Sequence, residues 1–417
     1  MRERFYIETF ENGLTLLAQP VRQVSSAAMT ISVSAGAAAD PQGEEGAAAV
    51  AGKWLLRGAG DMDTRRLHDA LDNLGCRHSE RVQSEFLTLT AASLGRHLPK
   101  LIGLYAQILQ QPRLGDDTFE PCRQWTAQEL ESLEDEPSRK ANMLLRQRFY
   151  PEPFGRCVYG SEKSLAALSA ESVRKHIKGR IAPGSTIVAV AGNVEFEPLL
   201  EWVSQAFGPW QAPKPEAVKP GRIQNGRTHI RKDSAQTHIT LAHPAAGLDD
   251  PEYYRARIVQ MVLSGGMASR LFTEVREKRG LVYHVSTRYH AIQHRAGMFT
   301  YAGCEPDKAQ ETFDVTVGEL KRLAEGIEDD EIDRAHVQAR SSLVMQGEST
   351  SARSAAMASD YRHLGRLRSL EEISDALQAV TIPDVLEYLE HWPAQDMTSL
   401  TIGPDPVDTA AADEVDA

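Results

Sequence analysis

The feature that most constrains the fold is a pattern that occurs twice along the 417 residues. In the first half, a helix beginning after Ser169 is followed by an alternating strand that ends at Gly192. In the second half, a helix beginning after Thr381 is followed by a strand that ends at Gly403. Serine and threonine favour helix N-termini because their hydroxyls accept a hydrogen bond from a free backbone N–H. A cap, a helix and a strand in the same order at near-equal spacing predict a duplicated domain of about 200 residues.

The rest of the chain predicts two mixed domains joined by a linker, since a chain of this length exceeds one ordinary core. Residues 207–227 are rich in proline and glycine and lack apolar periodicity, which predicts an extended linker. A hairpin signal at Asn12-Gly13 and a helical pattern over Asp63–Leu74 favour α+β domains over a doubly wound parallel sheet. We therefore expect domains at 1–212 and 228–404, a linker at 213–227 and a disordered acidic tail at 405–417.

Composition excludes several classes of function. Hydrophobic residues make up 41% and charged residues 25%, which is typical of a soluble globular protein, and the net charge of −12 argues against nucleic-acid binding. No apolar stretch approaches the roughly 20 residues that span a membrane. The N-terminus has no apolar signal region, so the protein is expected in the cytoplasm if Met1 is the natural start. The four cysteines form no C-x-x-C pair and predict scattered reduced thiols: Cys76, Cys122, Cys157 and Cys304.

Known catalytic motifs are missing from the sequence. It contains no H-E-x-x-H, H-x-x-E-H, phosphate-binding Walker loop, G-x-S-x-G or G-x-G-x-x-G. Only one pair of its 13 histidines, His290 and His294, stands four residues apart. The pattern around this pair is strand and loop, so the two side chains would not share a helix face. We interpret them as exposed hairpin histidines rather than metal ligands.

One block of the second half nevertheless resembles a known family. Ser264–Tyr283, SGGMASRLFTEVREKRGLVY, resembles the most recognisable block in the C-terminal domain of the pitrilysin/insulysin family of inverzincin metallopeptidases, in its bacterial and mitochondrial-processing-peptidase-like branch. The resemblance implies two homologous domains, each a mostly antiparallel sheet packed by helices, which form half of a clam-shell chamber. Other blocks follow the family order along nearly the whole chain: Phe5–Leu16, Gly46–Ala59, Arg123–Pro137, Gly155–Leu168, Ala191-Gly192 and Thr237–His243.

The segment that resembles the active-site helix departs from the family pattern. The family binds zinc through H-x-x-E-H, where two histidines bind the metal and the glutamate acts as general base. Here Ala49 replaces the first histidine, Gly52 the glutamate and Lys53 the second histidine, while Glu129 keeps the third ligand position acidic. These residues predict a lost zinc site in which the Lys53 ammonium takes the place of the metal beside Glu129. The alternative is that the Lys53 stem lies along the surface and Glu129 is solvated.

The second half keeps positions that contact substrate in active relatives. The resemblance implies that Arg276 and Tyr283 bind the carbonyl at the scissile bond and steady the developing oxyanion. Taken alone, Arg276 belongs to a charged run typical of a solvated helix end, and Tyr283 would be a half-buried strand residue. Gly265 and Gly266 are expected to form either a mobile substrate-binding loop or a plain turn between helices.

Together these residues predict the non-catalytic subunit of a heterodimeric zinc peptidase. The chain would hold no cofactor and show no activity alone. It would complete a metalloendopeptidase when paired with a homologous subunit that carries H-x-x-E-H and the zinc, and it would act on a peptide or unfolded polypeptide. The alternative is a catalytically dead homologue that serves as a scaffold or peptide-holding protein, as a homodimer or in a larger complex. A peptidase with other metal ligands is disfavoured because no replacement cluster is visible.

Overall fold

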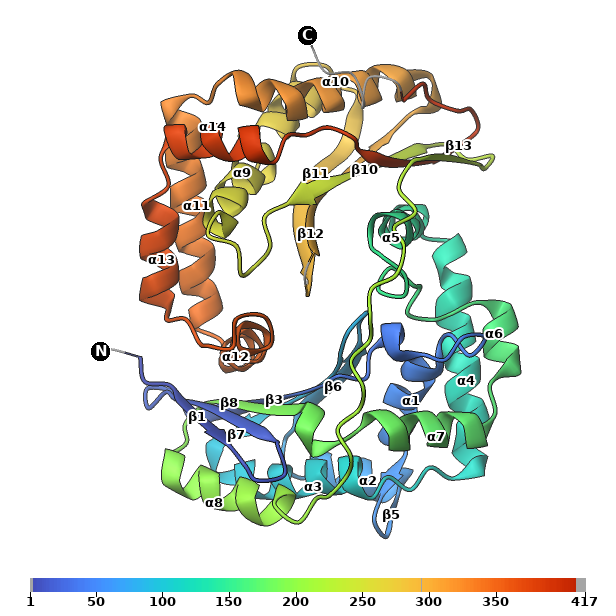
Figure 1. The fold of residues 1–417 in the computed structure, drawn as a ribbon, viewed down its shortest axis with the longest axis vertical. Helices are drawn as coiled ribbons and strands as arrows, with labels where there is room; N and C mark the ends of the chain where they lie inside the picture. The colour runs from blue at the N-terminus through green and yellow to red at the C-terminus, as the bar shows by residue number, and fades with distance from the viewer. Residues whose placement is uncertain (1–2, 294, 410–417) are drawn as a thin grey trace. The chain divides into compact units, whose positions relative to one another are not determined.

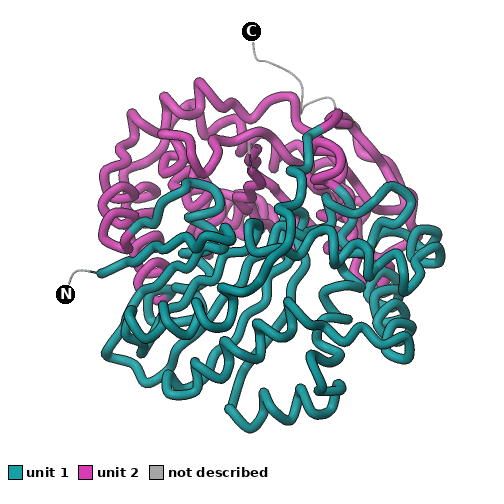
Figure 2. The backbone as a smooth tube through the Cα atoms, turned by 60° about the horizontal axis from the view of Figure 1, so that its bottom comes forward, with its two compact units in different colours: residues 1–132, 156–220, 346–368 teal, residues 133–155, 221–345, 369–417 magenta. Residues whose placement is uncertain are grey.

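A computed structural model describes residues 3–293 and 295–409. The chain forms two compact units, and each unit combines segments from both halves of the sequence (Figure 2). Unit 1 contains residues 1–132, 156–220 and 346–368, and unit 2 contains residues 133–155, 221–345 and 369–417. Among the described residues, no helix has the length and apolar character needed to cross a membrane.

Unit 1 is built on a six-stranded sheet with the order β1-β2-β8-β3-β7-β6 (Figure 1). All neighbouring strands are antiparallel except the parallel pair β2–β8. The hairpin predicted at Asn12-Gly13 is confirmed, because it joins β1 to β2. The strands are β1 (Tyr6–Thr9), β2 (Thr15–Pro20), β3 (Ser26–Val33), β6 (Arg77–Val82), β7 (Leu87–Leu94) and β8 (Thr186–Gly192), with a small separate pair β4 (Gly58–Ala59) and β5 (Met62–Asp63).

Helices cover both faces of this sheet because its strands alternate apolar side chains to each side. Leu16 and Ile31 pack into the larger core under most of the helices, whereas Leu17 and Ala189 face α12 through Met357. The helices are α1 (Ala47–Leu55), α2 (Thr64–Asp72), α3 (Leu98–Gln110), α4 (Asp116–Glu131), α6 (Glu162–Ala167), α7 (Ala170–Arg180), α8 (Phe196–Phe207) and α12 (Thr350–Leu364).

Unit 2 is built on a five-stranded sheet with the order β11-β12-β10-β13-β9. Its neighbours are antiparallel except the parallel pair β13–β9. The strands are β9 (Arg227–Arg231), β10 (Thr237–Ala245), β11 (Val282–Ile292), β12 (Arg295–Cys304) and β13 (Thr398–Gly403). The helices are α5 (Pro137–Phe149), α9 (Tyr253–Ser264), a π-helical turn η5 (Phe272–Glu277), α10 (Ala309–Arg322), α11 (Asp329–Gly347), α13 (Leu370–Gln378) and α14 (Ile382–His391).

The two sheets have equivalent topology. In strand order, β2-β8-β3-β7-β6 of unit 1 corresponds to β9-β13-β10-β12-β11 of unit 2, and the parallel pair falls at the same place in both. Both predicted caps are present: the Ser169 hydroxyl accepts from the Ser172 N–H, and the Thr381 hydroxyl accepts from the Asp384 N–H. This agreement supports the duplication inferred from the repeated pattern and confirms an α+β architecture with two sheet-containing domains.

Each sheet is also covered by one helix from the other half of the sequence. In unit 1, α12 packs on β3 and β8 (Figure 1), and in unit 2, α5 packs on β10 and β13. The Arg362 guanidinium of α12 donates to the backbone carbonyl of Ser32 at 2.7 Å, which fixes the helix on its sheet. Residues 209–226 and 404–409 contain neither helix nor strand, and the rest of the predicted tail, 410–417, lies outside the described residues.

Candidate functional site

Helix α1 carries Ala49, Gly52 and Lys53, the residues that the resemblance aligns with the family's zinc motif. Every residue of α1 except Lys53 is buried, and the helix packs on α4, α7 and β6. Gly46 precedes the helix and has no side chain to cap it. The Asp40 carboxylate provides the cap, because it accepts from the backbone N–H groups of Gly46 and Ala48 at 2.8 Å each. The first turn of α1 is therefore held from a preceding loop.

Lys53 and Glu129 form the ion pair predicted from the sequence. Lys53 Nζ lies 3.1 Å from Glu129 Oε1, and Nζ also lies 4.4 Å from the centre of the Trp125 ring. The Lys53 side chain is only 9% exposed, which rules out the alternative of a stem lying along the surface, while Glu129 is 31% exposed. Trp125 and Glu129 stand four residues apart on α4, so both side chains face α1. The ammonium is thus held between a carboxylate and an aromatic face.

The residues at this position do not fit a zinc ion. Ala49 and Gly52 carry no donor atom, and a lysine ammonium repels a divalent cation. A Cβ atom on Gly52 would lie 3.0 Å from Val82 Cγ2 and 3.3 Å from Leu87 Cδ1, so a side chain at this position would crowd both neighbours. Throughout the described part of the chain, no group of three or more His, Cys, Asp or Glu side chains is placed to hold a metal.

A buried acid–imidazole contact lies beside the N-terminus of α1. Asp40 Oδ1 is 3.7 Å from His176 Nε2 on α7, and both side chains are almost fully buried. Burial raises the pKa of Asp40 to about 7 against the opposing effect of the two backbone N–H groups. Burial, reinforced by the Arg180 guanidinium, lowers the pKa of His176 to about 4. Near neutral pH the His176 imidazole is therefore uncharged, and Asp40 titrates around neutrality.

In unit 2 the structure brings Arg276 and Tyr283 together. Arg276 lies in η5 and Tyr283 is the second residue of β11. The Arg276 guanidinium carbon lies 5.2 Å from the centre of the Tyr283 ring and 4.8 Å from that of Phe272. Tyr283 is 80% exposed, so the interpretation as a half-buried strand residue is wrong. The pair presents a guanidinium and a phenol side by side on the surface of unit 2.

The ion pairs of the charged run distinguish Arg276 from its neighbours. Lys278 Nζ and Arg279 Nη1 lie 2.6 Å and 2.9 Å from the two carboxylate oxygens of Glu274. Within the described residues, by contrast, no carboxylate forms an ion pair with Arg276. Lys278 and Arg279 therefore fit a solvated helix end, whereas Arg276 is held by aromatic rings with its charge available to a ligand.

Gly265 and Gly266 follow α9 directly and lie against α11. A Cβ on Gly265 would be 2.1 Å from Gln338 Oε1, and one on Gly266 would be 2.7 Å from Gln338 Nε2. The Gln338 side chain can move, but a Cβ on Gly265 would also lie 2.5 Å from the Met261 carbonyl oxygen, so the close approach of the backbone favours glycine at that position. The following Met267 is 77% exposed, so the same turn presents an apolar side chain to solvent.

The interpretation of His290 as an exposed hairpin histidine is wrong. His290 is half-buried, and its Nδ1 lies 2.7 Å from the hydroxyl of Tyr150, which follows α5. Burial lowers the pKa of His290 to about 3, so the ring is neutral at physiological pH. His294 lies outside the described residues. All four cysteines are buried.

Two sequence models of one family match the chain. "Insulinase (Peptidase family M16)" matches residues 16–162, and "Peptidase M16 inactive domain" matches residues 167–338. Together they span well over half of the chain, so it belongs to the M16 (insulinase) family of peptidases, which confirms the resemblance to the pitrilysin/insulysin family. The words "inactive domain" describe residues 167–338 and do not refer to α1.

Relatives and solved structures agree with this assignment. The chain is 26% identical over 411 residues to an uncharacterized zinc protease of Rickettsia bellii, covering 97% of this chain and 98% of that protein. It is 27% identical over 404 residues to one of Mycobacterium tuberculosis, covering 95% and 92%. A peptidase M16 inactive domain from Pseudomonas fluorescens has the same fold, with a TM-score of 0.89 at 19% identity over 97% of this chain and all of that one. A chain of Complex III2 from Candida albicans superposes with a TM-score of 0.84 at 18% identity, covering 96% of both.

Proposed function

We propose that this chain is the non-catalytic subunit of a heterodimeric zinc peptidase. The observation that carries the proposal is the Lys53–Glu129 ion pair, because a cation of the chain itself neutralises the one remaining ligand carboxylate. In a family member with such a site, the lysine ammonium takes the place that zinc would need, so this site would not activate water for peptide hydrolysis. Its contribution to peptide hydrolysis would have to come from other residues, and the metal from a homologous partner that carries H-x-x-E-H.

Arg276 and Tyr283 are the residues proposed to make that contribution. A guanidinium and a phenol both donate hydrogen bonds, and the tetrahedral intermediate of peptide hydrolysis carries its charge on one oxygen. Arg276 stacks on the Tyr283 ring, so the two donors are held at one place before substrate arrives. Arg276 forms no ion pair with a carboxylate among the described residues. Binding of an oxyanion by its guanidinium therefore breaks no existing ion pair.

The substrate class proposed is a peptide or an unfolded polypeptide, bound between this chain and the zinc-bearing subunit in the cytoplasm. The turn at Gly265 and Gly266 is proposed as an additional substrate contact. In this role the exposed side chain of Met267 would lie against apolar substrate residues, since methionine adapts to varied shapes.

Purification of the tagged chain from its native host tests the proposal. The expected product is a complex with a homologue that contains H-x-x-E-H, with about one zinc ion per pair and peptidase activity. The chain purified alone should contain no stoichiometric zinc and cleave no peptide. Recovery of a homodimer, or of a stable complex without peptidase activity, would favour a scaffold or peptide-holding role. About one zinc per chain in the isolated protein, lost in Glu129→Ala, would contradict the proposal.

A further inference from the structure

Unit 2 contains a pocket of about 440 Å³ that lies outside the Arg276–Tyr283 pair. It forms where β13 separates from β10. The two strands pair only as far as Ala242 and Thr398, whereas β10 continues to Ala245 beside β12. Pro244 lies in the part of β10 that pairs with β12 alone, and it has no N–H that would need a partner on the side of β13. The volume falls in the range of about 300–1,000 Å³ that is usual for small-ligand sites.

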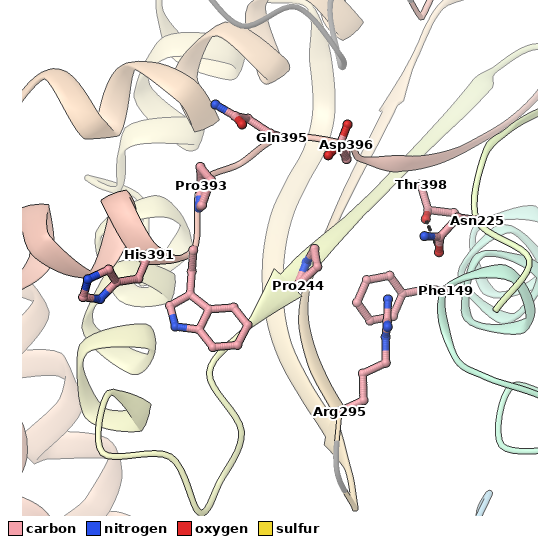
Figure 3. A pocket seen from close by; sticks show the side chains of 10 residues that line it. Phe149, Asn225, Pro244, Arg295, His391, Pro393, Gln395, Asp396 and Thr398 are labelled. Atoms are coloured by element: carbon pink, nitrogen blue, oxygen red, sulfur yellow. Dashed lines mark hydrogen bonds between the residues drawn. The ribbon is translucent and has the colours of Figure 1, made fainter. Parts of the chain in front are cut away.

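One wall of the pocket carries a cation without a counter-charge. The Arg295 guanidinium carbon lies 4.4 Å from the centre of the Phe149 ring, and Figure 3 shows the two side chains next to each other. Phe149 in turn lies against the backbone of Gly297, where a Cβ would come within 2.5 Å of the ring. Arg295 Nε is buried without a hydrogen-bond partner, and within the described residues no carboxylate pairs with this guanidinium. Among the residues that the structure describes, the guanidinium is therefore held against a ring and has no acceptor for its Nε–H.

The remaining lining of the pocket combines apolar and polar side chains. The Trp392 ring lines the pocket, and its orientation is fixed because its Nε1 donates to Glu252 Oε2 at 2.9 Å. Pro244 and Pro393 add apolar surface. The exposed residue Asp396 also lines the pocket, and Figure 3 shows it well apart from Arg295. The pocket thus offers the Arg295 guanidinium, the His391 imidazole, whose pKa is raised by its hydrogen bond to Glu252, a surface of Trp392 and prolines, and the Asp396 carboxylate.

We propose that this pocket binds the C-terminal end of a peptide. The terminal carboxylate would pair with Arg295, the last side chain would pack on Trp392 and the prolines, and a backbone N–H would donate to Asp396. A single guanidinium opposed by a carboxylate suits a monoanion that also carries donors, and it disfavours phosphates with two charges. The site does not depend on the proposed zinc-bearing partner, because all of its lining residues belong to unit 2.

Calorimetric titration of the purified chain with acetyl-Ala-Ala-Phe, as the free acid and as the C-terminal amide, tests this inference. The acid should bind saturably at millimolar concentration or below, and the amide about ten- to a hundredfold more weakly, since it lacks the charged acceptor. Equal binding of acid and amide, or no binding of the acid, would overturn the proposal. This comparison needs no variant, so it stands even where a substitution impairs folding.

Two variants then locate the site. Arg295→Gln should reduce binding of the acid about tenfold or more, to the level of the amide. The matched control is Arg257→Gln, because Arg257 also stacks on a ring of unit 2, 5.6 Å from the centre of Tyr289, but does not line the pocket. Equal losses in both variants would overturn the assignment to this pocket. N-acetylphenylalanine binding as tightly as the tripeptide would identify a small carboxylate, not a peptide end, as the ligand. None of these outcomes bears on the role proposed for Arg276 and Tyr283.

Discussion

Removing Glu129 should destabilise unit 1 more than removing Lys53, because the lysine is the deeper member of their ion pair. The Lys53 side chain is 9% exposed, whereas Glu129 is 31% exposed and can be solvated in part. In Glu129→Met the ammonium stays buried and keeps only the Trp125 ring 4.4 Å away. In Lys53→Met the carboxylate can turn towards water. In the double variant neither charge is left without a partner, so this change should cost less than the two single changes combined.

The magnitudes follow from the 3.1 Å contact and the incomplete burial of Glu129. Breaking a fully buried pair costs about 3–5 kcal/mol, and a charge-assisted hydrogen bond contributes about 1.5–3 kcal/mol. We therefore expect losses of about 3 kcal/mol for Glu129→Met and about 2 kcal/mol for Lys53→Met, with a coupling energy of about 2 kcal/mol in the double-mutant cycle.

Urea unfolding followed by tryptophan fluorescence measures these losses mainly in unit 1, which contains most of the tryptophans: Trp54, Trp125, Trp202 and Trp210, against Trp392 in unit 2. The control cycle uses Arg65 and Asp69, which are 91% and 64% exposed and 4.0 Å apart. Their coupling should stay below about 0.5 kcal/mol. A Lys53–Glu129 coupling no larger than that of the control would refute the idea that the ammonium takes the place of the metal.

Two further predictions concern the ends and the interior of α1. In the folded protein burial raises the pKa of Asp40 to about 7, so its contribution to stability is greatest below about pH 4 and is lost as the pH rises through 7. In Asp40→Asn the melting temperature should depend less on pH between pH 4 and pH 7 than in the unchanged protein. Asp40→Ala should lower the free energy of unfolding by about 2 kcal/mol, because it leaves the N–H groups of Gly46 and Ala48 without their acceptor. Gly52→Glu should cost about 2 kcal/mol, because its Cβ would crowd Val82 and Leu87 and its carboxylate would start from a buried position. Elemental analysis should still find no stoichiometric zinc, and a stable variant with about one zinc per chain would contradict this expectation.

The zinc-site position shows how far sequence reasoning reaches. The contact between Lys53 and Glu129 could be predicted because family ligands that meet at one metal must lie close together, and the structure has the contact. Trp125, which completes the surroundings of the ammonium, was missed although its spacing of four residues from Glu129 on a helix placed it on the same face. Asp40 gave no such signal, because its carboxylate reaches α1 from a loop.

The covering of each sheet by a helix from the other half of the sequence could not be predicted from the sequence. The apolar face of a helix predicts that it is buried, but not which sheet it covers. The side chains of α12 pack under Leu17 and Ala189 in the first half of the sequence, and α5 packs on strands of the second half. His290 was misjudged for the same reason, since its partner Tyr150 lies far away in sequence at the end of α5. Local sequence patterns predict strands and helix caps, whereas contacts between residues far apart in sequence are known only from the structure.

The central claim is most directly tested by the kcat/KM of the reconstituted complex with Tyr283→Phe and Arg276→Ala. Each variant should lower kcat/KM by about ten- to a thousandfold, because each removes a donor to the oxyanion, while assembly and zinc content stay unchanged. Lys278→Ala, in the same charged run but paired with Glu274, is the matched control and should keep nearly full activity. Full activity in both Tyr283→Phe and Arg276→Ala would contradict the account and leave this chain without a part in the chemistry.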